Sequence, residues 1–133
     1  MSIRMNLLFE VSGNYKVGKV ISQQGKAYHI ETASGKRIKV RSKDILFEFN
    51  SLFPFLILEK AKKIAVELDI KFLWEVSGSD EFSFLQLSDD YFGMIASPQE
   101  TIALLLKLVS SPIYFQKRGN GKFKAAAAEK ITA

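Results

Sequence analysis

The densest group of chemically active side chains in this sequence lies near its end. The eleven positions from 114 to 124 include four cationic and three aromatic residues and no acidic residue. Cations neutralise phosphates and flat rings stack on unpaired bases, so this composition indicates a surface for single-stranded nucleic acid. The cations, called the hairpin cations below, are Lys117, Arg118, Lys122 and Lys124, and the rings, called the hairpin rings, are Tyr114, Phe115 and Phe123.

A turn signal lies at the centre of this group. Gly119-Asn120-Gly121 separates two short aromatic segments, which predicts a β-hairpin. Upstream, Ser97-Pro98 with Glu100 is a strong helix-start pattern, so we expect a helix over 98–110 directly before the hairpin. A helix that leads into a basic hairpin is typical of the end of a winged helix-turn-helix domain. A structural role for the rings stays open, because at least one can anchor the hairpin to the helices.

The rest of the composition offers little that could perform catalysis. There is no cysteine, which excludes disulfides, thiolate zinc sites and cysteine nucleophiles, and the single His29 cannot form a histidine-rich metal site. Asp89 and Asp90 are adjacent, and neighbouring side chains on a helix diverge by about 100°, so a solvated helix end explains them better than a metal site. We therefore expect no cofactor in this chain.

The sequence predicts neither a membrane span nor a secretion signal. No window approaches eighteen consecutive apolar residues, and the N-terminus lacks the basic, apolar and small-residue order of a signal peptide. We therefore expect a cytoplasmic protein with no membrane partner.

The net charge of +5 is divided unevenly along the chain. Residues 1–49 hold nine Lys/Arg against four Asp/Glu, residues 50–111 hold five against nine, and residues 112–133 hold five against one. Two basic segments on either side of an acidic one indicate polyanion binding, because phosphate attraction depends on local cation density. The alternative is a chance clustering of surface lysines that only aids solubility.

Residues 1–50 predict a small β-barrel. Apolar and polar residues alternate in five short segments that are separated by turn residues. The expected strands cover 7–11, 15–22, 26–32, 36–41 and 45–49. A meander of this length is typical of an SH3-like or related barrel.

The fourth of these strands carries three cations on one face. Alternation over 36–41 turns Ile38 and Val40 inward and leaves the basic residues outside. These residues, called the strand cations below, are Arg37, Lys39 and Arg41. A basic strand face can follow the phosphates of a nucleic acid, or it can protect a sheet edge from aggregation, and both interpretations stay open.

Residues 51–133 predict a winged helix domain. Apolar residues recur at helical spacing over 55–68, and capping patterns start two further helices at Ser83 and Ser97. Segment 70–76 fits helix or strand and holds the only tryptophan, Trp74, which we expect in the core, with a binding platform as the less favoured alternative. The predicted fold class is α+β: a small SH3-like β-barrel at 1–50 is followed by a winged helix-turn-helix domain at 51–133 that leads into a truncated C-terminal helix.

Six runs of residues, spread over almost the whole chain, carry a family resemblance. They are Ala33-Ser34-Gly35-Lys36-Arg37, Phe72-Leu73-Trp74-Glu75, Asp80-Glu81-Phe82, Tyr91-Phe92-Gly93, Ser97-Pro98 with Glu100, and Tyr114-Phe115 with Gly119, Gly121 and Phe123-Lys124-Ala125-Ala126. In order and spacing they resemble the N-terminal region of bacterial ribonuclease II-like (RNB family) exoribonucleases.

This resemblance implies an accessory region that engages single-stranded RNA. Members of the family hydrolyse RNA from its 3′ end with magnesium held by clustered aspartates in a large central domain. Asp80, Asp89 and Asp90 lack the spacing of that cluster, so no catalytic residue is carried over to this chain. Single-stranded RNA and a downstream catalytic domain of the same protein are the implied partners, and the magnesium is expected in that domain.

Two functions from other classes stay open. A winged-helix DNA-binding regulator would read bases with helix 98–110, whose candidate exposed positions are Gln99, Glu100, Ala103 and Lys107. That helix is apolar nearly all round and holds one lysine, so it has few side chains that could hydrogen-bond to base edges. A protein-docking module would instead use the acidic middle segment as its contact surface, with the apolar excess of helix 98–110 partly exposed.

Overall fold

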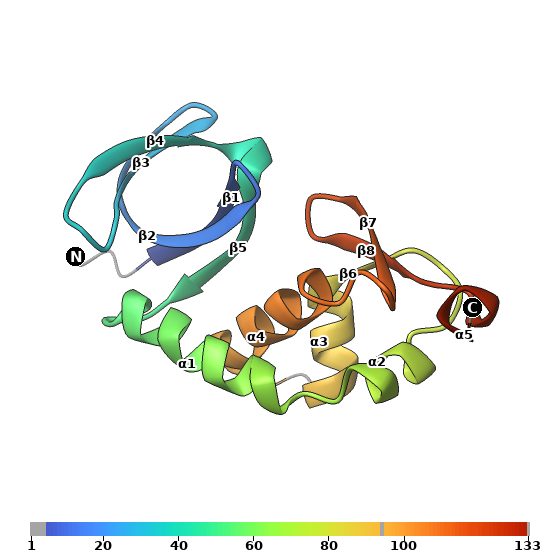
Figure 1. Cartoon of the computed structure of the whole chain (residues 1–133). Helices are drawn as coiled ribbons and strands as arrows, with labels where there is room; N and C mark the ends of the chain where they lie inside the picture. The colour runs from blue at the N-terminus through green and yellow to red at the C-terminus, as the bar shows by residue number, and fades with distance from the viewer. Residues whose placement is uncertain (1–4, 94, 133) are drawn as a thin grey trace. The chain divides into compact units, whose positions relative to one another are not determined.

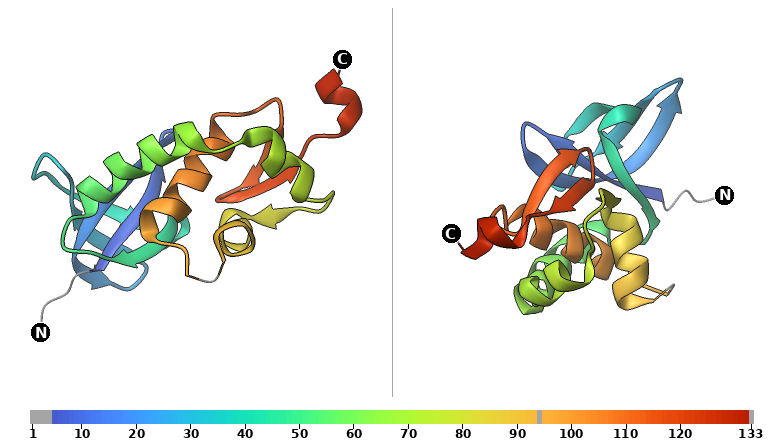
Figure 2. Two further views of the ribbon diagram at one scale, coloured as in Figure 1. Left: turned by 90° about the horizontal axis from the view of Figure 1, so that it is seen from below. Right: turned by 90° about the vertical axis from the view of Figure 1, so that its right-hand side faces the viewer.

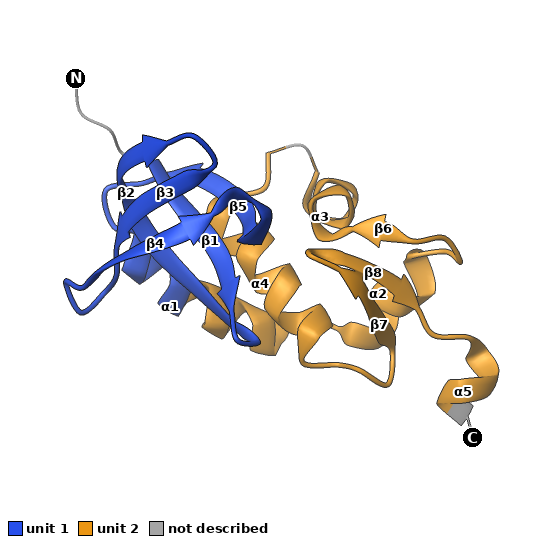
Figure 3. Ribbon diagram, turned by 90° about the horizontal axis from the view of Figure 1, so that it is seen from above, with its two compact units in different colours: residues 1–59 blue, residues 60–133 orange. Residues whose placement is uncertain are grey.

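The computed structural model describes residues 5–93 and 95–132, so the outermost ends of the two predicted domains lie outside the described residues. The order of strands and helices can be followed in Figure 1 and from two other sides in Figure 2. The chain forms two compact units, Met1–Glu59 and Lys60–Ala133, coloured separately in Figure 3.

The fold class is α+β. None of the helices in the described part of the chain has the length and apolar character needed to cross a membrane.

The first unit is built on a five-stranded antiparallel sheet with the order β4-β3-β2-β1-β5. Its strands are β1 (Met5–Val11), β2 (Asn14–Gln24), β3 (Ala27–Glu31), β4 (Arg37–Arg41) and β5 (Ile45–Asn50). A short 3-10 helix, Ser42–Asp44, links the two edge strands β4 and β5. All five predicted strands are confirmed within two residues of their expected bounds. No ladder closes this sheet within the described residues.

The sheet curls on itself (Figure 1), and one apolar cluster forms its core. Leu7, Phe9, Ile30 and Val40 form this cluster, and Ile45 of the other edge strand packs against it, so side chains from both edges share one core. The predicted inward direction of Val40 is therefore confirmed. The Ile30 side chain lies so close to the backbone of β2 that a Cβ added at residue 18, which is glycine, would overlap it.

The second unit combines helices with a three-stranded sheet of order β6-β8-β7. Helix α1 (Pro54–Glu67) begins in the first unit and continues into the second. The remaining elements are α2 (Ile70–Val76), β6 (Phe82–Ser83), α3 (Phe84–Phe92), α4 (Pro98–Val109), β7 (Phe115–Gly119), β8 (Lys122–Ala125) and α5 (Ala128–Thr132). The ambiguous segment 70–76 is a helix.

Side-chain caps explain where α3 and α4 begin. Ser97 accepts a hydrogen bond from the Glu100 backbone N–H, and Glu100 accepts one from the Ser97 backbone N–H at 2.8 Å, which completes the predicted capping box. Ser83 caps α3 by accepting from the Leu85 N–H. The two helices are tied together inside the core, where the hydroxyls of Ser88 and Thr101 share a hydrogen bond of 2.9 Å.

Helix α4 forms the centre of the second core. Residues 101–105 and Leu108 are buried, and Gln99, Glu100 and Lys107 are half-buried. Ala103 was expected at an exposed base-reading position, and this prediction is wrong because Ala103 is fully buried. The apolar character of α4 is therefore used for packing, and its neighbours include α3 and β7.

Candidate nucleic-acid interface

The predicted hairpin is formed by β7 and β8. Asn120 and Gly121 make the turn, where Gly121 has a φ of +73° that favours glycine. The strands pair with Gln116 opposite Lys124 and Lys117 opposite Phe123, and the register shifts between Lys117 and Gly119. Because directly opposite residues of an antiparallel pair project to the same face, this register assigns each side chain of the hairpin to one face of the sheet.

The hairpin cations are divided between these faces. Lys122 and Lys124 lie two positions apart on β8 and project to the same side as Gln116, which we call the outer face. Lys117 shares the opposite, inner face with Phe123, but it is exposed. Arg118 lies in the register shift and is also exposed, and Lys124 is half-buried.

The hairpin rings do not form the expected stacking surface. Phe115 and Phe123 are only 2% and 1% exposed, because the inner face of the sheet packs on the helices. Phe82 of β6 packs against both of them, with ring centroids 5.9 Å from Phe115 and 6.4 Å from Phe123. No face of either ring is open to a base, so their assignment as base-stacking residues is wrong for this structure, and they anchor the hairpin instead.

The third hairpin ring, Tyr114, lies outside this buried group. It is half-buried, and its ring meets the Trp74 indole edge-on at 6.2 Å between centroids. Trp74 was expected in the core, but it is half-buried and its Nε1–H donates to the Ala126 carbonyl at 2.7 Å. The structure therefore offers a different aromatic side chain, for which binding was the less favoured interpretation of the sequence.

The strand cations all lie exposed on β4, an edge strand of the first sheet. Opposite them on β3, Arg37 faces Glu31, Lys39 faces His29 and Arg41 faces Ala27. Their outward direction is therefore confirmed. An edge position suits both protection of the edge and contact with phosphates, so the geometry leaves both interpretations open.

Two hollows lie beside the predicted basic residues, one in each unit. In the first unit a hollow of about 530 Å³ adjoins Arg41 and is lined also by Lys26 and Lys43. In the second unit a groove of about 730 Å³ adjoins Lys124 and is lined also by Trp74 and Lys130. Lys26, Lys43 and Lys130 were not singled out from the sequence, and Lys26 and Lys130 join their basic neighbours only through the fold.

Within residues 5–93 and 95–132 no three His, Asp or Glu side chains gather closely enough to hold a metal ion. The chain matches no protein-family model, no curated protein and no solved structure.

Proposed function

We propose that this chain is an RNA-binding accessory region of a ribonuclease II-like, 3′-to-5′ hydrolytic exoribonuclease. In this proposal the hairpin of the second unit contacts single-stranded RNA, and the strand cations add a second basic surface. The chain contributes binding, while cleavage and its magnesium belong to a catalytic domain elsewhere in the same protein. The family resemblance of the sequence motivates the choice of RNA and of the parent enzyme.

The fold details of the proposal are an SH3-like barrel and a winged helix. The curled meander of the first unit supports the former. The second unit has a short strand, two helices and a hairpin in this order, with the last strand in the middle of its sheet, and this arrangement supports a winged helix in which β7 and β8 form the wing.

One observation carries the functional proposal: the hairpin presents cations where nothing acidic lies beside them in sequence. No Asp or Glu occurs between residues 112 and 128, so the attraction of the hairpin cations for phosphate is not offset locally along the chain. Lys122 and Lys124 project together from a strand whose inner face is fixed by buried rings. A rigid, basic and outward-facing strand is suited to neutralising successive phosphates.

The burial of α4 disfavours a DNA-binding regulator. Such a protein places exposed polar side chains of its recognition helix in the major groove. Here residues 101–105 and Leu108 are buried, and only Lys107 adds a cation to the helix. The same burial removes most of the apolar surface of α4 that a protein-docking module would need to expose.

Fluorescence anisotropy with a labelled single-stranded RNA of about twelve nucleotides tests the proposal, because single-strand sites commonly span a few to about sixteen nucleotides. We expect saturable binding that is stronger than binding to duplex DNA of the same length. Replacing all four hairpin cations by alanine should weaken RNA binding and flatten its salt dependence.

A matched control removes the same amount of charge from helices. Its four sites are the exposed residues Lys60, Lys62, Lys63 and Lys71. Replacement of these residues by alanine should leave RNA affinity close to that of the wild type. Equal losses in the two variants would show that only net charge matters, and sequence-selective binding to duplex DNA would favour the regulator instead.

A further inference from the structure

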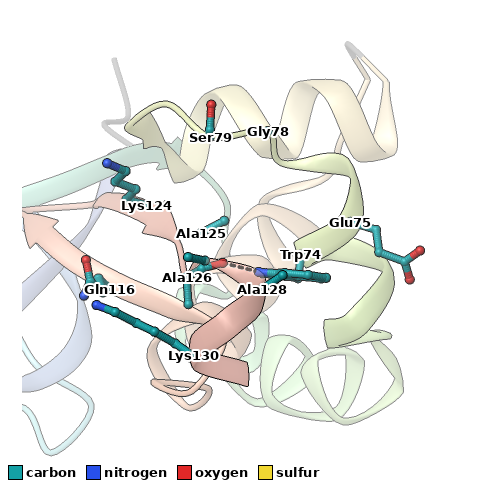
Figure 4. Close-up of a pocket in the computed structure, with 11 residues that line it drawn as sticks. Trp74, Glu75, Gly78, Ser79, Gln116, Lys124, Ala125, Ala126, Ala128 and Lys130 are labelled. Atoms are coloured by element: carbon teal, nitrogen blue, oxygen red, sulfur yellow. Dashed lines mark hydrogen bonds between the residues drawn. The ribbon is translucent and has the colours of Figure 1, made fainter. Parts of the chain in front are cut away.

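The groove of the second unit combines an aromatic side chain with cations. It has a volume of about 730 Å³ and lies between the end of α2, the strands β7 and β8, and α5 (Figure 4). Its lining includes Trp74, Glu75, Gln116, Lys124, Lys130 and the small residues 125–128. This volume lies within the range of about 300–1,000 Å³ that is typical of small-molecule sites.

The Trp74 indole is held in one orientation. Its Nε1–H donates to the Ala126 carbonyl at 2.7 Å, and Tyr114 packs edge-on against the ring. The indole also lines the groove and is only half-buried. A ring that is already fixed loses little conformational entropy when a ligand stacks on it, and stacking of a base on an aromatic side chain contributes about 1–3 kcal/mol.

Three polar side chains of the groove lie on one side of this ring. Gln116 and Lys124 are cross-strand partners on the outer face of the hairpin, and Lys130 reaches the same side from α5 (Figure 4). The Glu75 carboxylate points away on the opposite side. Two ammonium groups bind a phosphate, while an amide can donate to and accept from the edge of a base.

We propose that this groove binds one nucleotide, with its base against the Trp74 indole and its phosphate held by Lys124 and Lys130. An aromatic wall, an amide and two cations match a flat base that carries a phosphate. This inference rests on the proposed function for the statement that the nucleotide belongs to single-stranded RNA. Lys124 also lies on the outer face with Lys122, so a bound strand can continue from the groove along the hairpin.

The groove has a built-in reporter, because Trp74 is the only tryptophan of the chain. Three small ligands separate the contacts: adenosine 5′-monophosphate (AMP), adenosine, and ribose 5-phosphate, which has no base. We expect AMP to quench Trp74 emission saturably and ribose 5-phosphate to leave it unchanged. Adenosine should reach the same final quenching at higher concentration, because it lacks the phosphate. Excitation at the red edge of indole absorption avoids absorption by the nucleotide.

Two variants test the assigned contacts. Lys130→Ala removes an exposed side chain and should weaken AMP binding about 5-fold, the upper end for an exposed ion pair, without changing adenosine binding. Ala127→Leu adds bulk to an exposed position that lines the groove and should abolish quenching by both ligands. Near-ultraviolet circular dichroism of the tryptophan and tyrosine bands establishes that each variant keeps its fold.

Parallel titration with single-stranded RNA separates this inference from the proposed function. Anisotropy that reports RNA binding while neither RNA nor AMP changes Trp74 emission retains the proposed function and overturns the groove assignment. Quenching by AMP without RNA binding supports the groove assignment and overturns the proposed function. Equal loss of AMP and adenosine binding in Lys130→Ala overturns the assignment of the phosphate to Lys130.

Discussion

The two lysines on the outer face of β8 give the most specific prediction of the RNA-binding proposal. Lys122 and Lys124 lie two residues apart on one strand, about 6.6 Å along its axis, so both can contact neighbouring phosphates of one strand. Replacing both by alanine leaves the buried inner face of the sheet untouched. The change is therefore expected to alter binding while the fold stays intact.

The size of the effect follows from counterion release. Each phosphate contact adds about 0.7 to the slope of log affinity against log salt for a single strand, so removing two contacts lowers the slope by about 1.4. At about 0.1 M salt this corresponds to roughly 25-fold weaker RNA binding by the double variant, or about 1.9 kcal/mol. The RNA affinities of the variant and the wild type converge near about 1 M salt.

Anisotropy titrations of labelled RNA at several salt concentrations measure this slope directly. Lys60→Ala/Lys63→Ala is the matched control, because it removes two exposed lysines of α1 and should leave the slope near that of the wild type. A loss of affinity that is the same at every salt concentration would refute the reasoning, since it would mean that the lysines act through folding. An unchanged affinity would remove the outer face from the interface.

Three further predictions concern the anchoring of the hairpin, the start of α4 and the strand cations. Phe123→Ala should destabilise the protein by about 3–5 kcal/mol in urea unfolding, because the ring is 1% exposed, whereas Val66→Ala, at a position 79% exposed, should change stability by less than about 0.5 kcal/mol. Ser97→Ala should cost about 1 kcal/mol in the same assay, since it removes the side chain that caps α4; no change would mean that the capping box contributes nothing. Replacement of the three strand cations by alanine should lower the salt slope of RNA binding by about 2 if they contact phosphates, whereas light scattering should show association of the protein, with RNA affinity retained, if they protect the edge.

Local signals explain why much of the fold could be predicted from the sequence. The turn around Gly13 joins β1 to β2, and a tight turn fixes the register of the two strands that it connects. The capping box at Ser97 marks the first residue of α4 in the same way. These signals need no information from distant parts of the chain.

Elements that depend on distant partners could not be predicted in this way. Strand β6 is only two residues long and exists because Phe82 pairs with Phe123, some forty positions away along the chain. The apolar surroundings of Trp74 in the sequence suggested a core position. Its indole is instead held by a hydrogen bond to the Ala126 carbonyl, 52 residues further along the chain. Apolar content alone does not distinguish a buried ring from one that lines a groove.

The hairpin rings and cations are best understood together, through their register. The sequence between 114 and 124 shows rings beside cations, and this suggested one mixed surface. In the structure the pairing of Phe115 with Ala125, and of Phe123 with Lys117, turns both phenyl rings to the inner face. Because the period of a strand is two, the same register turns Lys122 and Lys124 outward.

Burial of the rings therefore supports the interface even though it removes the rings from it. A two-stranded hairpin alone is marginally stable in water, so unanchored lysines on it would lose affinity through disorder. Phe82, Phe115 and Phe123 pack together and hold the hairpin on the helices, which keeps the outer lysines in fixed positions. On this argument Phe123→Ala should weaken RNA binding as well as stability, and at high salt its loss should persist, unlike that of Lys122→Ala/Lys124→Ala.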